Sequence, residues 1–313
     1  MQLLYALAEL RTPFLDALLG ALTNCGGELV FMAAAIIVFW CVSKSCGYYM
    51  LTVGFVGTIV NQFLKLVFRI PRPWVKDPDF QIVESARAEA TGYSFPSGHT
   101  QNVFASFGCL GRWTRQTWLR VVCALLIVVT AFSRMYLGVH TPLDVGVSFG
   151  LGLVLVFALY PLFRDIDSHP KRLYLLFVAM AVLSAAYLLF AELWPFPADV
   201  DAANLASGRK NAYTLLGAVL GMTFAYWLDR RYVHFDVRAV WWAQVLKAVL
   251  GLAITIGLRA ALKAPLLALC GGHNVANLIR YALMVIFAAG IWPMTFGWFG
   301  RLGQKKPASG ASD

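Results

Sequence analysis

The chain has 313 residues, of which 59% are hydrophobic and 13% are charged, and its formal net charge is +10. A soluble domain averages about 45–50% apolar and about 25% charged residues, so this composition excludes an ordinary soluble protein and indicates a polytopic membrane protein. The basic residues are scattered over short segments, which membrane topology explains better than a nucleic-acid surface does.

The first 28 residues mix apolar residues with charged ones and are interrupted by Pro13. This pattern predicts an amphipathic helix that lies at the membrane surface. The segment has neither a basic start nor a small-residue cleavage site, so we expect no cleaved signal peptide. The six cysteines of the chain form no Cys-x-x-Cys pair and are expected to fill the core instead of binding a metal.

Nine apolar runs follow, and with their flanks they are candidate membrane spans. They cover about residues 29–43, 47–68, 99–111, 119–137, 144–163, 173–194, 211–228, 240–258 and 275–297. We therefore expect an all-α membrane helix bundle. It comprises the N-terminal segment 1–28, a six-span core over residues 29–194, and an extension over residues 195–313 with about three further spans.

Half of the 26 Lys and Arg residues fall in short segments that lie on one side of such a bundle. These are Lys44, Arg112, Arg115, Arg120, Arg164, Lys171, Arg172, Arg230, Arg231, Arg238, Arg301, Lys305 and Lys306. On the other side, basic residues are mixed with most of the acids. Because cytoplasmic loops carry an excess of Lys and Arg, we expect the N-terminus outside and the C-terminus in the cytoplasm.

The first polar motif joins the end of the second span to the loop after it, as Lys65-x6-Arg72-Pro73. Prolines on both sides of Arg72 favour an extended or turned backbone, which could bring Arg72 back toward Lys65. Two such cations suit a phosphate group, with Arg as a fork and Lys as a point charge. The alternative is a pair of basic residues whose heads reach the membrane interface.

The second motif is Phe95-Pro96-Ser97-Gly98-His99, directly before an apolar run. It predicts a helix start, where exposed backbone N–H groups bind anions, Gly98 allows close approach and Ser97 adds a hydroxyl donor. His99 at the membrane edge could protonate a leaving oxygen. A helix cap beside an interfacial histidine is the alternative.

The third motif is Ser133-Arg134-x5-His140-x3-Asp144, between two strongly apolar runs. Pro142 opens the fifth span, with Thr141 as its expected N-cap and Asp144 at the third helical position. The same geometry brings the Asp144 carboxylate toward His140, where it would fix the ring tautomer and leave the other nitrogen free to attack.

Together these motifs resemble the type-2 phosphatidic acid phosphatase superfamily, the lipid-phosphatase relatives of the vanadium haloperoxidases. The family pattern is K-x6-RP, then PSGH, then SR-x5-H-x3-D, and all three parts are complete and in order in this chain. The resemblance covers roughly residues 29–194, with the last third of the chain beyond it.

The resemblance implies phosphoryl transfer without a metal ion or other cofactor. His140 would attack phosphorus and form a phosphohistidine, with Asp144 orienting it. His99 would protonate the leaving group and then activate water. The phosphate oxygens would be held by Lys65, Arg72, Ser97, the Gly98 amide and Arg134.

We therefore expect an enzyme of the cell membrane that hydrolyses a lipid phosphate or an isoprenoid diphosphate, such as undecaprenyl diphosphate, at the extracytoplasmic face. The alternatives are a phosphotransferase that uses the same intermediate and a phosphatase of a soluble sugar phosphate. A non-enzymatic transporter fits less well, because it has little use for a complete set of cations, histidines and a carboxylate at one face. No nucleic-acid partner is expected.

Overall fold

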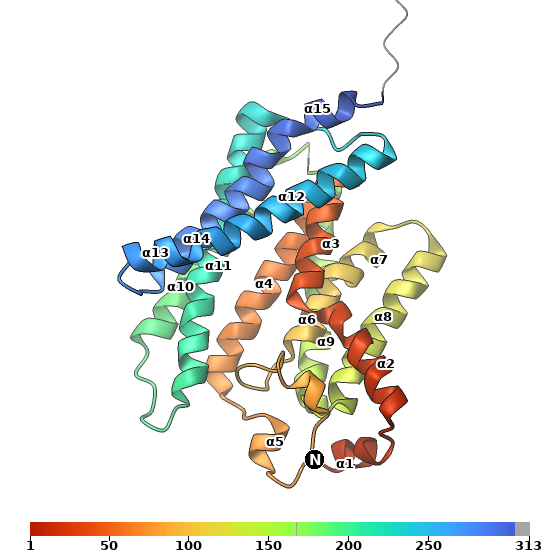
Figure 1. Cartoon of the computed structure of the whole chain (residues 1–313), viewed down its shortest axis with the longest axis vertical. Coiled ribbons are helices and arrows are strands. Elements are labelled where there is room, and N and C mark those ends of the chain that lie inside the picture. The colour runs from red at the N-terminus through yellow and green to blue at the C-terminus, as the bar shows by residue number, and fades with distance from the viewer. Residues whose placement is uncertain (167, 304–313) are drawn as a thin grey trace, which may run out of the picture.

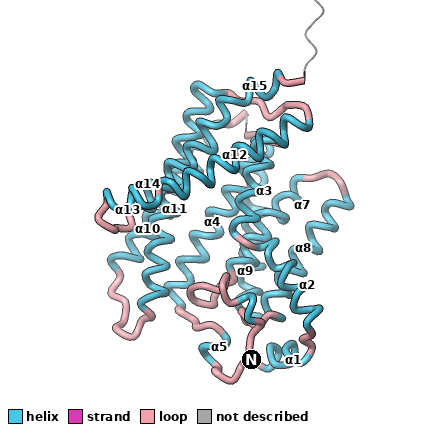
Figure 2. The backbone as a smooth tube through the Cα atoms, viewed as in Figure 1, coloured by secondary structure: helices cyan, strands magenta, loops and turns pink. Residues whose placement is uncertain are grey.

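The computed structural model describes residues 1–166 and 168–303, and these form helices joined by turns and loops, with no β-strand among them (Figures 1 and 2). The elements, in which η marks a 3₁₀ or π turn, are α1 (Gln2–Glu9), α2 (Pro13–Thr23), η1 (Asn24–Gly26), α3 (Glu28–Cys41), α4 (Lys44–Phe68), α5 (Pro73–Lys76), η2 (Glu84–Ala86), α6 (Gly98–Val103), η3 (Phe104–Gly108), α7 (Cys109–Trp113), α8 (Thr117–Tyr136), α9 (Pro142–Arg164), α10 (Pro170–Leu193), α11 (Ala202–Leu228), η4 (Asp229–Val233), α12 (Trp241–Ala261), α13 (Lys263–Leu269), α14 (Val275–Ile286), η5 (Phe287–Ile291), η6 (Trp292–Thr295) and α15 (Phe296–Arg301). The expected all-α fold is confirmed.

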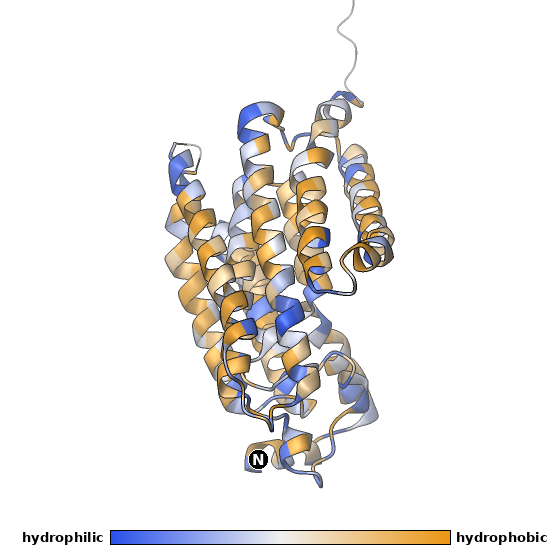
Figure 3. Ribbon diagram, turned by 90° about the vertical axis from the view of Figure 1, so that its left-hand side faces the viewer, coloured by the Kyte–Doolittle hydropathy of each residue, from blue (hydrophilic) through white to orange (hydrophobic). Residues whose placement is uncertain are grey.

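Each of the nine expected spans coincides with a helix or a run of helical turns. By length and composition, six helical stretches of the described chain can cross a membrane, and the bent pair formed by α2–η1 and α3 raises this to at most seven. The other two expected spans are the short run from α6 to α7 and the helix α11, which carries Arg209 and Lys210 within it. Figure 3 shows apolar residues along the sides of the long helices, where lipid would surround them.

The single surface helix expected over residues 1–28 is instead two helices, α1 and α2, followed by the turn η1. The break has a local cause. The Thr12 hydroxyl accepts from the Leu15 amide at 3.3 Å and caps a new helix start, at which Pro13 takes the first position.

Helix α4 runs through the centre of the molecule and buries more of its length than the other candidate spans do. Its neighbour α3 packs tightly against it at two glycines. A Cβ on Gly47 would lie 2.4 Å from Cα of Phe39, and one on Gly54 would lie 2.0 Å from the Phe31 ring. Small residues let membrane helices approach closely, so these glycines fix the α3–α4 pair.

The C-terminal part packs as a second group of helices against the same core. Helix α11 lies between α10 and α14, and Gly217 and Gly221 allow the α14 backbone to come close. The indole N–H of Trp40 in α3 donates to the carbonyl of Ala288 in η5 at 2.8 Å, which ties the two groups together. Helix α12 crosses the bundle obliquely (Figure 1).

The loop between α4 and α6 closes over one end of the bundle, at the bottom of Figure 1. A small apolar cluster holds it there, in which Phe80 and Ile82 of the loop pack with Leu4 of α1 and with Tyr136 and Val139 beside the α8–α9 turn. Removing this apolar area from solvent stabilises the loop in one position. The three polar motifs lie under it.

Candidate active site

Lys65 lies in the last turn of α4, which ends where Arg69 adopts a left-handed conformation with φ of 48°. The Arg69 amide donates to the Lys65 carbonyl at 3.0 Å and closes the helix. The Lys65 side chain is buried, and its ammonium group donates to the Tyr93 carbonyl. A buried cation is thereby fixed against the loop that precedes α6.

Arg72 is buried and connects that loop to the α8–α9 turn. Its Nη2 donates to the Thr91 carbonyl at 2.6 Å and its Nε to the Gly92 carbonyl at 3.0 Å. Its Nη1 lies 3.0 Å from the Val139 carbonyl and 2.9 Å from Nε2 of His140. The guanidinium therefore sits directly against the ring expected to act as the nucleophile.

The two ring nitrogens of His140 face groups of opposite charge. Nε2 contacts Arg72, and Nδ1 lies 3.6 Å from Oδ2 of Asp144. Because a guanidinium nitrogen only donates, we assign the ring proton to Nδ1, on the carboxylate side. Burial lowers the pKa of His140 well below its ordinary value, and the charges of Arg72, Arg134 and Lys65 lower it further. The ring is therefore neutral at pH 7, with a lone pair on Nε2.

Asp144 also takes part in the helix cap that the sequence predicts at Thr141. The Thr141 hydroxyl accepts from the Asp144 amide at 3.3 Å, and Oδ2 of Asp144 accepts from the Thr141 amide at 2.7 Å, which completes a capping box. The Ser94 hydroxyl donates to the same Oδ2 at 2.6 Å. These bonds hold the carboxylate beside His140.

Helix α6 begins at Gly98 with Ser97 as its N-cap, within the motif that was expected to start a helix. The Ser97 hydroxyl accepts from the Thr100 amide at 3.4 Å and from the Thr100 hydroxyl at 3.0 Å, so it serves the cap. The Ser97 amide donates to the Asp144 carbonyl at 3.1 Å. A Cβ built on Gly98 would meet nothing within 4 Å, so open space for an anion adjoins this helix start.

His99 pairs with a carboxylate that none of the three motifs contains. Its Nε2 lies 2.8 Å from Oε2 of Glu89, whose side chain is 54% exposed on the loop, whereas that of His99 is 12% exposed. The loop thus presents a negative charge to the histidine expected to donate a proton.

Arg134, in the last turn of α8, is almost fully buried, and Nη1 donates to the Thr23 hydroxyl at 2.9 Å. Its Nε and Nη2 have no hydrogen-bond partner among the residues that the structure describes. An unpaired buried cation is costly, so these nitrogens are suited to an anion that enters the site.

The structure therefore brings all eight residues predicted for the site together around the α8–α9 turn and the start of α6. These are Lys65, Arg72, Ser97, Gly98, His99, Arg134, His140 and Asp144. Three buried cations stand against one buried carboxylate, an arrangement that favours a phosphate group. Within residues 1–166 and 168–303, no group of three or more His, Cys, Asp and Glu side chains could hold a metal ion.

Three contacts of this site lie outside the motifs. Glu89, Ser94 and Thr23 meet His99, Asp144 and Arg134, respectively. Their spacing from the motif residues carries no periodic signal, because each is brought in by the folding of a loop or of the N-terminal helices. The sequence could have offered Glu89 and Ser94 only as polar residues in a loop near the second motif.

Comparison with known proteins matches two parts of the chain to family models. Residues 45–168, which hold every predicted site residue, match the model described as PAP2 superfamily. Residues 213–305 match the model described as PAP2 superfamily phosphatase, transmembrane extension. No solved structure matches the chain.

Among curated proteins, the chain is similar to several phosphatases. It is 25% identical over 178 residues to phosphatidylglycerophosphatase B of Bacillus subtilis, across 52% of this chain and 80% of that protein. It is 33% identical over 108 residues to undecaprenyl-diphosphatase BcrC of Bacillus subtilis, across 34% of this chain and 52% of that protein. The lipid A 4'-phosphatase of Bacteroides thetaiotaomicron is 26% identical over 154 residues, which cover 46% of this chain and 67% of that protein.

Proposed function

Because the chain belongs to the PAP2 superfamily, we propose that it is an integral membrane phosphatase that hydrolyses a lipid phosphate or an isoprenoid diphosphate through a phosphohistidine on His140. Its relatives are named for phosphatidylglycerophosphate, undecaprenyl diphosphate and lipid A, which supports a lipid phosphate as the substrate class.

One observation carries the proposal: the neutral His140 ring stands between the Arg72 guanidinium and the Asp144 carboxylate. The carboxylate keeps the proton on Nδ1 and would stabilise the positive ring as Nε2 forms a bond. The guanidinium marks where phosphate oxygens would lie. Nη1 of Arg72 lies against Nε2 of His140, so a bound phosphate would take over this donor and free the lone pair.

In the first step, Nε2 of His140 attacks phosphorus and the bond from phosphorus to the leaving oxygen breaks. The proton that the leaving alcohol or phosphate needs comes from His99. Lys65, Arg72, Arg134 and the Gly98 amide neutralise the charge on the phosphoryl oxygens. These cations supply the charge stabilisation, so no step of the proposal uses a metal ion.

In the second step, water attacks the phosphorus of the phosphohistidine. His99, now without its proton, accepts one from that water, and the bond from phosphorus to Nε2 breaks. Inorganic phosphate leaves, and both histidines return to their starting states. The hydrolysis is thereby balanced, with water as the sole co-reactant.

We also propose how the chain is divided and oriented. Residues 29–194 would be the catalytic core and residues 195–313 the extension, with the active site on the extracytoplasmic side. The ranges of the two family matches fall within this core and this extension, respectively. A site at the ends of the helices suits a lipid whose head group leaves the hydrocarbon while its tails stay in it.

The test is phosphate release by the purified full chain over a panel of lipid phosphates, lipid diphosphates and sugar phosphates. We expect turnover of one lipid class and a loss of at least about 10³-fold in His140→Ala, as for other lost nucleophiles. The matched control is His169→Ala, which removes an exposed histidine from the loop before α10 and should keep full activity.

Three results would contradict the proposal in different ways. A near-native rate in His140→Ala would exclude His140 as the nucleophile. Transfer of the phosphoryl group to an acceptor lipid, with no free phosphate, would make the protein a phosphotransferase. Turnover of sugar phosphates alone would exclude a lipid substrate.

A further inference from the structure

A layer of buried polar side chains lies one helical turn deeper in the bundle than the phosphatase site. Its members are Asn61 in α4, Gln101 in α6, Thr130 in α8 and Ser148 in α9. Each stands four residues from a residue of the site, and these site residues are, in the same order, Lys65, Ser97, Arg134 and Asp144. Residues four apart lie on the same face of a helix, so each member of this polar layer lies beneath its counterpart in the site.

The polar layer finds no hydrogen-bond partners in the protein. Its four side chains are at most 2% exposed. None of their side-chain nitrogen and oxygen atoms bonds to another of the described residues. A buried polar group costs free energy unless it is hydrogen-bonded, and groups that the protein leaves unpaired are commonly paired by internal water. Four such side chains at one depth therefore indicate a ligand.

Packing contacts bring the members of the polar layer together. Helix α6 lies against α4, α8 and α9. On α4, a Cβ on Gly57 would lie 2.0 Å from Nε2 of Gln101, and Asn61 follows Gly57 by one turn on the same face. On α9, a Cβ on Gly152 would lie 2.4 Å from an aromatic ring of η3, the continuation of α6. Ser148 precedes Gly152 by one turn, so it also lies on the face of α9 that meets α6 and η3.

The carboxylate of Asp144, above this layer, is also incompletely bonded. Its Oδ2 accepts from the Thr141 amide and the Ser94 hydroxyl, but its Oδ1 has no partner among the described residues. Side chains in a helix lean toward its N-terminus, and Asp144 lies one turn nearer to the start of α9 than Ser148 does. The Ser148 side chain therefore leans toward the carboxylate.

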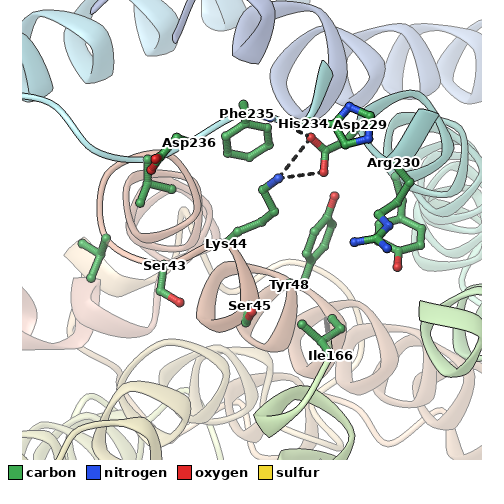
Figure 4. Close-up of a pocket in the computed structure, with 13 residues that line it drawn as sticks. Ser43, Lys44, Ser45, Tyr48, Ile166, Asp229, Arg230, His234, Phe235 and Asp236 are labelled. Atoms are coloured by element: carbon green, nitrogen blue, oxygen red, sulfur yellow. Dashed lines mark hydrogen bonds and ion pairs between the residues drawn. The ribbon is translucent and has the colours of Figure 1, made fainter. Parts of the chain in front are cut away.

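The other buried carboxylate of the described chain is fully bonded by the protein. Asp229, near the opposite end of α4, accepts from Lys44 Nζ at 3.1 Å through Oδ1 and at 2.8 Å through Oδ2 (Figure 4). Its Oδ1 also accepts from the Phe235 amide at 3.2 Å. The contrast shows that one oxygen of Asp144 is left for a ligand that can donate a hydrogen bond.

Water suits the space between Asp144 and the polar layer in both distance and chemistry. Four residues span about 6 Å along a helix, nearly the distance that one water molecule bridges with two bonds of about 2.8 Å. The free carboxylate oxygen needs a donor, which disfavours a halide ion, and the nearby cations Lys65 and Arg134 disfavour a metal ion. Water both donates and accepts, as the hydroxyl of Ser148 and the amide of Gln101 require.

We propose that the polar layer binds a small cluster of internal water molecules, through which Ser148 and Gln101 hold the free oxygen of Asp144. Both are then positioning residues for the reaction, and this role rests on the proposed phosphatase function. A donor on Oδ1 keeps the carboxylate from turning away from His140, so that Oδ2 stays beside Nδ1 while Nε2 attacks.

The first measurement is structural and needs no activity. A crystal structure of the purified full chain, at a resolution that shows ordered water, should contain water within hydrogen-bond distance of Asp144 Oδ1, Ser148 and Gln101. Crystals soaked in bromide should show no anomalous signal at these positions. A dry layer, or a bromide ion within it, would overturn the proposal.

The second measurement uses Ser148→Ala and Gln101→Met, which remove polar atoms and nearly keep the shape of each side chain. We expect kcat for p-nitrophenyl phosphate to fall roughly tenfold with KM little changed, because the phosphate is still held while Asp144 is less well fixed. Ser184→Ala is the matched control. This serine of α10 is equally buried, and its hydroxyl donates to the Met180 carbonyl at 2.8 Å. Ser184→Ala should keep the parent kcat.

Unfolding temperatures distinguish the remaining outcomes. If the layer were dry, removing an unpaired hydroxyl in Ser148→Ala would raise the unfolding temperature and leave kcat unchanged, against the proposal. A lower unfolding temperature with unchanged kcat would make the layer purely structural and overturn the positioning role. A parent chain that releases no phosphate from any substrate would refute the phosphatase function, while the crystal structure would still decide whether the layer binds water.

Discussion

At the scale of single residues, the contact between His99 and Glu89 gives the proposed acid a partner. The carboxylate lies on a loop and is half-exposed, while the histidine sits at the start of α6. A general acid works only when its proton points at the leaving oxygen, and Glu89 can fix the ring in that orientation. We regard Glu89 as a positioning residue.

The substitution Glu89→Gln keeps the shape of the side chain and removes its charge. We expect kcat for an alkyl phosphate to fall about tenfold, a fraction of the roughly 10²–10⁴-fold that a general acid supplies, with KM little changed. An aryl phosphate such as p-nitrophenyl phosphate needs less proton donation to its leaving group, so kcat for this substrate should fall less. Steady-state kinetics with both substrates measures this difference.

Glu84→Gln is the control, because Glu84 is an exposed carboxylate of the same loop whose partner is Arg87. Glu84→Gln should leave kcat and KM unchanged for both substrates. If Glu89→Gln lowered both rates equally, or lowered the unfolding temperature along with them, Glu89 would stabilise the loop and have no part in proton transfer.

At the scale of elements, the N-terminal helices press on the helix that carries His99. A Cβ on Gly26 in η1 would lie 2.5 Å from the carbonyl oxygen of His99 and 2.9 Å from Cγ2 of Thr130. The Thr23 hydroxyl in α2 also binds Arg134. Residues 1–26 therefore support two parts of the active site, although no motif lies in them.

Gly26→Ala should displace the start of α6, because the new Cβ would collide with the His99 carbonyl oxygen, a backbone atom that cannot rotate away as a side chain could. Overpacking of this kind costs about 1–3 kcal/mol, and a small shift of His99 should lower kcat several-fold. Gly20→Ala is the control, since its Cβ would meet only the Ser85 hydroxyl, at 3.9 Å. Thermal unfolding and phosphate release measure both effects, and unchanged values in Gly26→Ala would exclude this support.

Elements defined by local rules were predictable from the sequence. The capping box of Thr141 and Asp144 follows from residue types at fixed spacing, and the structure contains it. The apolar pattern predicts helix α11 only from residue 211, although the helix begins at Ala202, because Arg209 and Lys210 interrupt its apolar character. Tertiary packing stabilises this helix in the bundle, because α10 and α14 lie on either side of it and its glycines allow close contact.

The loop from residue 69 to residue 97 makes some contacts that the sequence predicts and others that it does not. Its prolines and charges predicted a turn near Lys65, and Arg72 does lie in the site. The carbonyls of Thr91, Gly92 and Tyr93 that hold Arg72 and Lys65 were not predictable, because backbone groups carry no sequence signal. Their positions follow from the closure of the whole loop over the bundle.

At the scale of the whole molecule, α4 connects the proposed active site with the opposite end of the bundle. Lys44 is its first residue and Lys65 lies in its last turn. At about 1.5 Å per residue the two are separated by roughly 30 Å, the thickness of a bilayer hydrocarbon core. The helix is therefore long enough to span the hydrocarbon core, and its direction across the membrane decides which leaflet the proposed active site would serve.

That direction can be measured with paired reporters. The end with Lys44 also carries exposed Arg115, Arg164 and Arg231, whereas exposed acids such as Asp79 lie at the end of the phosphatase site. The excess of positive charge favours the cytoplasm for the first end. A fusion of green fluorescent protein after residue 313 should therefore fluoresce, and alkaline phosphatase inserted after Asp79 should be active.

The reciprocal fusions control for expression and should both be inactive. Alkaline phosphatase activity at the C-terminus, with fluorescence from the insertion at Asp79, would invert the topology. The proposed phosphatase site would then face the cytoplasm. The residue chemistry proposed for the active site would survive that result, because it depends on contacts within the bundle. The leaflet that supplies the substrate would change.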